Sequence, residues 1–186
     1  MLETELKVAL TKEQYEQIQR ELTFKEGYEQ INFYYAPQGL EDVKGRPTIR
    51  IRSKKGRMQL EAKVPAGANE GSVKMHEEYA KDISCIPGTI TADEVSALTN
   101  GQFAEDVCLL GYLKTYRQIN TEYAGTEVAL DMNEYLGVTD YELEIEYEDE
   151  LPKELLNRLD FLDVEFDKSV TGKYRRFITR RKILDQ

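Results

Sequence analysis

The feature that most constrains this chain is the strict alternation of charged and apolar residues in several short segments. In TIRIRS, Arg50 and Arg52 alternate with isoleucines, and in DYELEIEYE a glutamate stands at every second position from Glu142. Successive side chains of a β-strand point to opposite faces, so a period of two is typical of strands. The alternation therefore predicts strands that have one charged face and one apolar face.

Eight segments are predicted as strands by this alternation, or by their content of β-branched and aromatic residues. They are Glu3–Leu10, Gln30–Ala36, Thr48–Ser53, Arg57–Val64, Ser72–Ile83, Leu109–Asn120, Thr126–Asn133 and Asp140–Glu148. The short KKG connection between the third and fourth segments indicates a β-hairpin.

Four further segments are predicted as helices, and they are Thr11–Leu22, Thr91–Gly101, Leu151–Leu162 and residues 168–184. The first two begin with a capping box, in which a threonine is followed three residues later by glutamine or glutamate. The pairs are Thr11 with Gln14 and Thr91 with Glu94. Strands and helices together indicate an α+β protein.

The charged faces of the strands fit two arrangements. An ordinary antiparallel sheet would turn them to water. However, one strand repeats arginine and another repeats glutamate, and like charges at every second position repel each other. Rows of opposite sign are easier to accommodate when they face one another across the lumen of a closed barrel, with helices covering the apolar exterior. Alternation alone does not decide between the solvated sheet and the barrel.

Composition narrows the function classes. A net charge of -10 argues against general binding to nucleic acid or to an anionic membrane. Cys85 and Cys108 form no metal or disulfide motif, which fits a reduced, cytoplasmic setting. No apolar run is long enough to span a membrane. The basic run RRFITRRK is interpreted as a solvated helix face rather than a nucleic-acid contact. The oligomeric state is left open.

The stretch Glu3-Thr4-Glu5-Leu6-Lys7 resembles the ExExK signature of the CYTH superfamily, also called triphosphate tunnel metalloenzymes. The order of the charged residues that follow, from Arg50 to the Glu142–Glu146 strand, extends the resemblance over nearly the whole chain. The chain is most similar to the small bacterial members that are often labelled as candidate adenylate cyclases. The resemblance implies a single domain, residues 1–186, built as a closed eight-stranded antiparallel tunnel with a charged lumen and exterior helices.

The resemblance also implies site residues. Phosphate binding is assigned to the basic residues Lys7, Arg50, Arg52, Lys63, Arg117, Lys168 and Lys173. Because carboxylates repel phosphate, an acidic row beside a phosphate site indicates a hard divalent cation, Mg²⁺ or Mn²⁺. Its ligands are assigned to Glu3, Glu5, Glu142 and Glu144. The catalytic group is assigned to Glu3, Glu5 and Lys7. Further residues expected to face the lumen are Arg57, Glu61, Glu78, Asp131 and Glu146.

The function that follows is metal-dependent hydrolysis of a small-molecule triphosphate, either inorganic tripolyphosphate or a nucleoside triphosphate. Two alternatives remain open at the same site. Adenylate cyclase activity ranks second, because the sequence contains no purine-reading motif. A non-catalytic polyphosphate or nucleotide binder would bind the same ligands without turnover.

Overall fold

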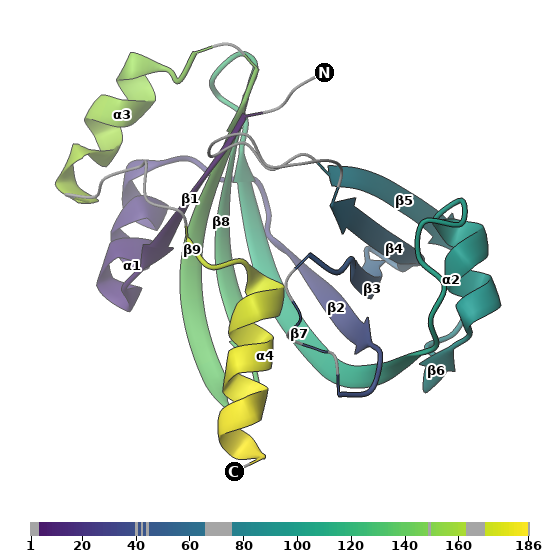
Figure 1. Ribbon diagram of the computed structural model, residues 1–186. Helices are drawn as coiled ribbons and strands as arrows, with labels where there is room; N and C mark the ends of the chain where they lie inside the picture. Colours follow the sequence, from purple (N-terminus) through teal and green to yellow (C-terminus); the bar gives the residue numbers. More distant parts are fainter. Residues whose placement is uncertain are drawn as a thin grey trace. The chain divides into compact units, whose positions relative to one another are not determined.

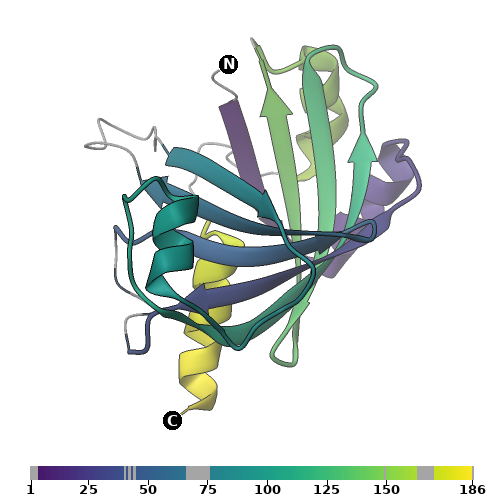
Figure 2. The same cartoon turned by 90° about the vertical axis from the view of Figure 1, so that its right-hand side faces the viewer.

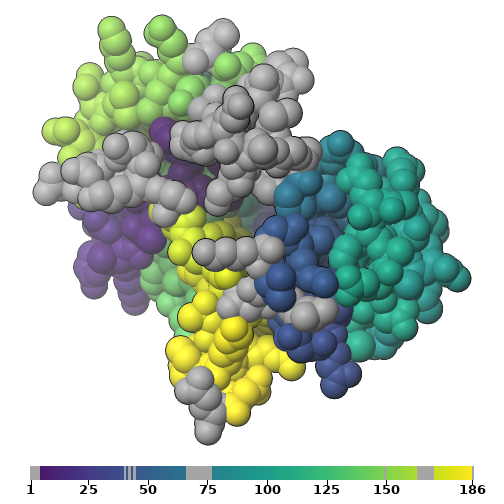
Figure 3. All heavy atoms as spheres, in the orientation of Figure 1, coloured from purple at the N-terminus to yellow at the C-terminus, as the bar shows by residue number. Residues whose placement is uncertain are grey.

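The computed structural model describes residues 4–39, 41, 43, 45–65, 76–148, 150–162 and 170–185, which are coloured in Figure 3. The predicted site residues Glu3 and Lys168 lie outside this set. The strands are β1 (Thr4–Leu10), β2 (Tyr28–Ala36), β3 (Thr48–Lys54), β4 (Arg57–Pro65), β5 (His76–Asp82), β6 (Thr89–Ile90), β7 (Val107–Asn120), β8 (Thr126–Tyr135) and β9 (Val138–Tyr147). The helices are α1 (Lys12–Glu21), α2 (Ala92–Leu98), α3 (Lys153–Leu159), the 3-10 helix η1 (Asp160–Leu162) and α4 (Lys173–Leu184).

The prediction of a closed eight-stranded barrel is wrong. The described strands form a nine-stranded antiparallel sheet in the order β1-β9-β8-β7-β2-β3-β4-β5, with β6 paired to β7. Within the described residues, no pairing joins β1 to β5, so the sheet is open. Alternation failed to predict this because it assigns each side chain to a face, and an open sheet has the same two faces as a barrel.

Local chemistry explains where the elements begin and turn. Both predicted capping boxes are present: the hydroxyls of Thr11 and Thr91 accept from the backbone of Gln14 and Glu94, whose side chains accept in return. The β3–β4 hairpin turns at Lys55 and Gly56, which both have positive φ, as the two-residue type I′ turn requires. Strand β6 was missed because two residues are too few to show alternation.

The chain divides into two compact units. Unit 1 consists of Met1–Glu29 and Lys114–Gly172, and unit 2 consists of Gln30–Leu113 and Lys173–Gln186. No helix in the described part of the chain is long and apolar enough to cross a membrane.

The core of unit 1 lies between the apolar face of its strands and the helices α1 and α3, which Figure 1 shows beside β1 and β9. Helix α1 contributes Tyr15, Ile18 and Leu22, and α3 with η1 contributes Leu155, Leu159 and Leu162. The strand residues of this core include Val8, Leu130, Leu143 and Ile145. The helices therefore cover the apolar face of these strands. The candidate functional site described below lies on the opposite, charged face.

The core of unit 2 lies between strands β2 to β4 and helix α2, which Figure 2 shows in front of the strands. Ile49 and Ile51 of β3 pack in this core with Val95 of α2. Helix α4 packs differently. Its Phe177 and Tyr174 contact the ring of Tyr34, with ring centroids 5.3 and 5.1 Å apart. Tyr34 lies opposite Arg50 in the β2–β3 register, so α4 packs on the charged face of this unit.

Candidate functional site

The charged face of unit 1 is assembled by the pairing of β1 with β9. In this register Lys7 lies opposite Glu144, and Glu5 lies opposite Glu146. The Lys7 ammonium is 2.8 Å from a carboxylate oxygen of Glu5 and 3.5 Å from one of Glu144. Glu5 and Lys7 remain partly exposed, whereas Glu144 is buried. The ExExK stretch thus presents a cation between two carboxylates, at a position that a ligand can reach.

A second set of ion pairs lies deeper on the same face. Arg117 of β7 donates two hydrogen bonds to the Asp131 carboxylate of β8, at 2.8 and 2.6 Å, and a further one to Glu144. Asp131 and Glu142, which lie opposite each other in the β8–β9 register, are fully buried. Burial alone would lower the pKa of Arg117, but the hydrogen bonds and charges of Asp131 and Glu144 outweigh burial and raise it. Arg117 is therefore a fixed positive charge.

Two overlapping groups of carboxylates on this face have the spacing of a metal site. Ligand oxygens of Glu5, Glu144 and Glu146 lie within 4.8 Å of one another. The same limit holds for a buried group that consists of Asp131, Glu142 and Glu144.

The electrostatics of Glu146 indicate a place for a cation. Burial raises the pKa of Glu146, and the negative charges of Glu5, Glu144 and Glu127 raise it further. A hard divalent cation would relieve this repulsion, and oxygen-only donors are the set that such cations prefer. The group of Glu5, Glu144 and Glu146 therefore fits a divalent metal ion.

The charged face of unit 2 is dominated by two arginines of β3. The Nε of Arg50 is 2.7 Å from a carboxylate oxygen of Glu61, and the Arg52 guanidinium is 3.8 Å from the other oxygen. The Nε of Arg52 donates to the Oδ1 of Asn32, at 3.0 Å. One carboxylate thus serves two guanidinium groups, so this face keeps an excess of positive charge.

The remaining predicted residues of unit 2 form more exposed pairs. Lys63 lies opposite Glu78 in the β4–β5 register, and their charged atoms are 3.0 Å apart. The hydrogen bond from Lys63 is the main reason that the pKa of Glu78 is lowered. Arg57 pairs with Asp82 near the hairpin, at 2.9 Å, and both side chains are largely exposed. Exposed ion pairs of this kind contribute little to stability.

Tyr34 marks where helix α4 adds to this basic face. Burial raises the pKa of the Tyr34 phenol, and nearby positive charges oppose the rise. The four residues that supply these charges are Arg50, Arg52, Lys173 and Arg176. Arg176 was not predicted, because the basic run of α4 was interpreted as a solvated helix face. Its position beside the Tyr34 ring contact could be recognised only once the packing of α4 was known.

The predicted site residues therefore fall into two sets. Unit 1 brings together Glu5, Lys7, Arg117, Asp131, Glu142, Glu144 and Glu146. Unit 2 brings together Arg50, Arg52, Glu61 and Lys173, with Lys63, Glu78 and Arg57 along β4 and β5. Asn32 was not predicted, because an uncharged residue in an aromatic strand carries no charge pattern.

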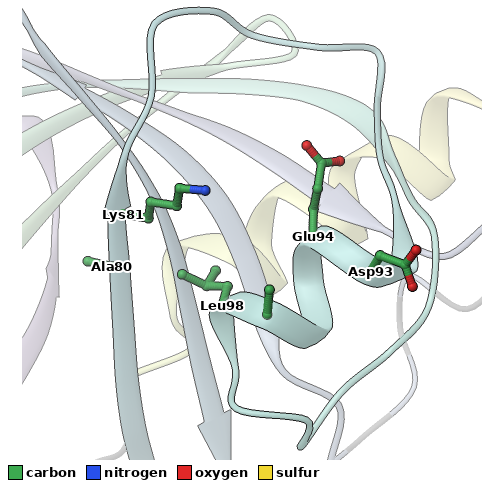
Figure 4. Close-up of a pocket in the computed structure, with 6 residues that line it drawn as sticks. Ala80, Lys81, Asp93, Glu94 and Leu98 are labelled. Atoms are coloured by element: carbon green, nitrogen blue, oxygen red, sulfur yellow. The ribbon is translucent and has the colours of Figure 1, made fainter.

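A surface hollow of about 420 Å³ lies elsewhere in unit 2, between β5 and α2. Figure 4 shows Lys81 of β5 and the acidic residues Asp93 and Glu94 of α2 around it. The Glu94 carboxylate already accepts from the backbone and hydroxyl of Thr91 as part of the helix cap. The hollow contains none of the predicted site residues.

Comparison with known proteins decides the family. A family model described as the CYTH domain matches residues 1–176 of this chain. This chain belongs to the CYTH domain family. No match was found among curated proteins.

Solved structures share the CYTH fold of this chain at low sequence identity. A candidate adenylate cyclase from Bacillus halodurans superposes with a TM-score of 0.71 and 23% identity, covering 95% of this chain and 97% of that chain. A Hippeastrum protein, described as a candidate adenylyl cyclase with a dominant triphosphatase activity, gives a TM-score of 0.68 and 19% identity, with 96% of each chain covered. A protein from Pyrococcus horikoshii gives 0.56 and 19%, with 100% of each chain covered.

Proposed function

We propose that this chain hydrolyses a triphosphate, inorganic tripolyphosphate or a nucleoside triphosphate, in a reaction that requires Mg²⁺ or Mn²⁺. The observation that carries the proposal is the group of Glu5, Glu144 and Glu146, whose oxygens lie within 4.8 Å of one another beside the Lys7 ammonium. Family membership and the triphosphatase activity described for the Hippeastrum protein support the same reaction.

The three carboxylates of this group would hold the metal ion. When bound, a divalent ion supplies positive charge to phosphate oxygens and helps to position the attacking water. Glu146 is suited to this role, because its own carboxylate is destabilised by burial and by its acidic neighbours.

Lys7 and Arg117 supply fixed positive charge on the same face. Lys7 is partly exposed, so its ammonium can neutralise a phosphoryl oxygen directly. Arg117 is largely buried and bound to Asp131 and Glu144, so it orients the Glu144 carboxylate. Loss of Arg117 would leave two buried carboxylates without their main counter-charge.

Arg50 and Arg52 are assigned to binding phosphate oxygens. A guanidinium group donates in a planar fork that matches phosphate, and it stays charged at every physiological pH.

In the reaction, a water oxygen forms a bond to the terminal phosphorus as the phosphoanhydride P–O bond breaks. The bonding pair leaves with the departing phosphate chain, and the water proton passes to solvent or to a carboxylate. Tripolyphosphate yields pyrophosphate and phosphate.

The test is phosphate release by the purified protein from tripolyphosphate, ATP and thiamine triphosphate, each with Mg²⁺ and with Mn²⁺. We expect turnover of at least one substrate, and loss of that turnover in Glu5→Gln. Glu16→Gln is a matched control, because Glu16 is an exposed residue of α1, the helix on the opposite, apolar face.

Other products would overturn the proposal in distinct ways. Cyclic AMP formed from ATP as the main product would assign the site to a cyclase. Calorimetric binding of tripolyphosphate with no turnover under any metal would make the protein a binder. Turnover that survives Glu5→Gln unchanged would remove the carboxylate group from the mechanism.

A further inference from the structure

Asn32 of β2 holds the Arg52 side chain in a fixed orientation. The Asn32 side chain is buried, with 1% of its surface exposed, and lies opposite Arg52 in the β2–β3 register. Its Oδ1 accepts from the Nε of Arg52, at 3.0 Å. Because a guanidinium group only donates, the atom that faces it must be the amide oxygen. The contact therefore also fixes where the amide nitrogen of Asn32 lies.

The amide nitrogen is the informative atom. The Nδ2 of Asn32 is buried, and no hydrogen-bond acceptor from the described residues lies within reach of it. Burying an amide without a partner is unfavourable, and folded proteins seldom leave such a group unsatisfied. A bound molecule or ion outside the chain is one way in which such an amide nitrogen is satisfied. Whatever completes Asn32 must accept a hydrogen bond, since Nδ2 can only donate.

The surroundings select the charge of that acceptor. Asn32 contacts Arg52, and Arg52 shares the Glu61 carboxylate with Arg50. On the same strand, Tyr34 lies within the influence of four positive charges, to which α4 contributes Lys173 and Arg176. An acceptor at this position is favoured when it is an anion, and a phosphoryl oxygen has both the charge and the geometry.

We infer that Asn32 is a phosphate-binding and positioning residue: its Oδ1 orients the Arg52 guanidinium, and its Nδ2 donates to a phosphoryl oxygen of the ligand. The inference rests on the proposed function, because it takes the triphosphate as the anion. It adds a neutral donor to a set that the sequence limited to lysine and arginine. A neutral donor aids recognition because its fixed geometry discriminates between anions of equal charge.

Asn32→Asp separates the two roles. Aspartate keeps an oxygen for Arg52 but replaces the donating nitrogen with an acceptor that repels phosphate. We expect the dissociation constant for tripolyphosphate, measured by calorimetry in EDTA, to rise about 10- to 100-fold, since a hydrogen bond to a charged group is lost. In the hydrolysis assay the KM should rise by more than kcat falls.

The control is Gln59→Glu. Gln59 lies opposite Arg52 on the other neighbouring strand, so this change also adds one negative charge next to the same guanidinium. Its Nε2 already donates to Asp82, at 3.0 Å. We expect a smaller loss of affinity than for Asn32→Asp. Equal losses would mean that only charge matters, and would overturn donation by Asn32.

Asn32→Ser guards against a folding defect in Asn32→Asp, because it introduces no buried charge. It should fold, as judged by circular dichroism, and bind tripolyphosphate more weakly than wild type. Wild-type affinity in both variants, with turnover intact, would overturn the inference and leave the proposed function standing. Tight binding of tripolyphosphate by the wild type without turnover would overturn the proposed function. The loss of affinity in Asn32→Asp compared with the loss in Gln59→Glu would still decide the inference.

Discussion

The charged faces of the two units are built from the same residue types in opposite proportions. On unit 1 carboxylates are in excess, with Glu5, Asp131, Glu142, Glu144 and Glu146 against Lys7 and Arg117. On unit 2 cations are in excess, with Arg50, Arg52, Lys173 and Arg176 acting around Tyr34 and Glu61 as the paired acid. The face of unit 1 therefore suits a cation, and the face of unit 2 suits an anion.

The largest expected effect concerns stability. On unit 1, Asp131 is fully buried and accepts two hydrogen bonds from Arg117. On unit 2, Glu78 is mostly exposed and pairs with Lys63. Asp131→Ala should lower the free energy of unfolding by about 3–5 kcal/mol, because a buried charge loses its partner. Glu78→Ala should change it by less than about 1 kcal/mol. Urea unfolding followed by circular dichroism measures both, and similar values would contradict the contrast.

The next effect concerns metal binding. Glu146→Gln should weaken Mn²⁺ binding by about 10- to 100-fold or more. Substitution of residues that only hold the metal ligands in place already has effects of that size, and Glu146 is proposed to be a ligand itself. Tripolyphosphate binding in EDTA should stay the same or tighten, because one negative charge is removed. Calorimetry with each ligand separately tests both statements. An unchanged Mn²⁺ affinity would exclude Glu146 as a ligand.

The mirror-image change lies on unit 2. Arg50→Lys keeps the charge but loses the planar fork, so tripolyphosphate binding should weaken about 10-fold while Mn²⁺ binding stays constant. Arg57→Lys is the matched control. The Arg57 side chain lies on the same face of the sheet as that of Arg50, but it pairs with Asp82 at an exposed position. Equal effects of the two substitutions would indicate nonspecific attraction.

The smallest effect concerns alkaline pH and involves one tyrosine from each unit. Burial raises the pKa of both Tyr15 and Tyr35 from 10.0 to about 12. Between these values the unfolded chain loses a proton that the folded chain keeps, so folding stability should fall as pH rises from 10 to 12. Tyr15→Phe and Tyr35→Phe should each reduce the loss of folding stability over this pH range by about 1 kcal/mol or less. Thermal unfolding across this pH range measures the slope, which would be unchanged if the phenols already titrate near their ordinary value.

Sequence patterns predicted the faces of the strands well, because the alternation of side chains is a local property. Arg50 with Arg52, and Glu142 with Glu144, lie on the faces that their spacing predicted. The caps at Thr11 and Thr91 were predicted for the same reason, since each depends on a residue only three positions away.

What the sequence did not predict depends on contacts between distant segments. Closure of a sheet requires its first and last strands to pair, and no local pattern specifies that. Arg176 joins the basic face only because Phe177 of the same helix packs on Tyr34, far away in the sequence. Asn32 became a candidate only when the Arg52 contact fixed its amide and left Nδ2 unsatisfied.

The pairing of β1 with β9 has a consequence for biosynthesis. Thr4 lies opposite Tyr147, so the ExExK strand leaves the ribosome long before its partner exists. Unit 2 likewise takes its last helix from the C-terminal end of the chain. Contacts between residues so far apart slow folding, and neither unit can be completed during early translation. The carboxylates of Glu5, Glu144 and Glu146 therefore come together only after strand β9 has been synthesised.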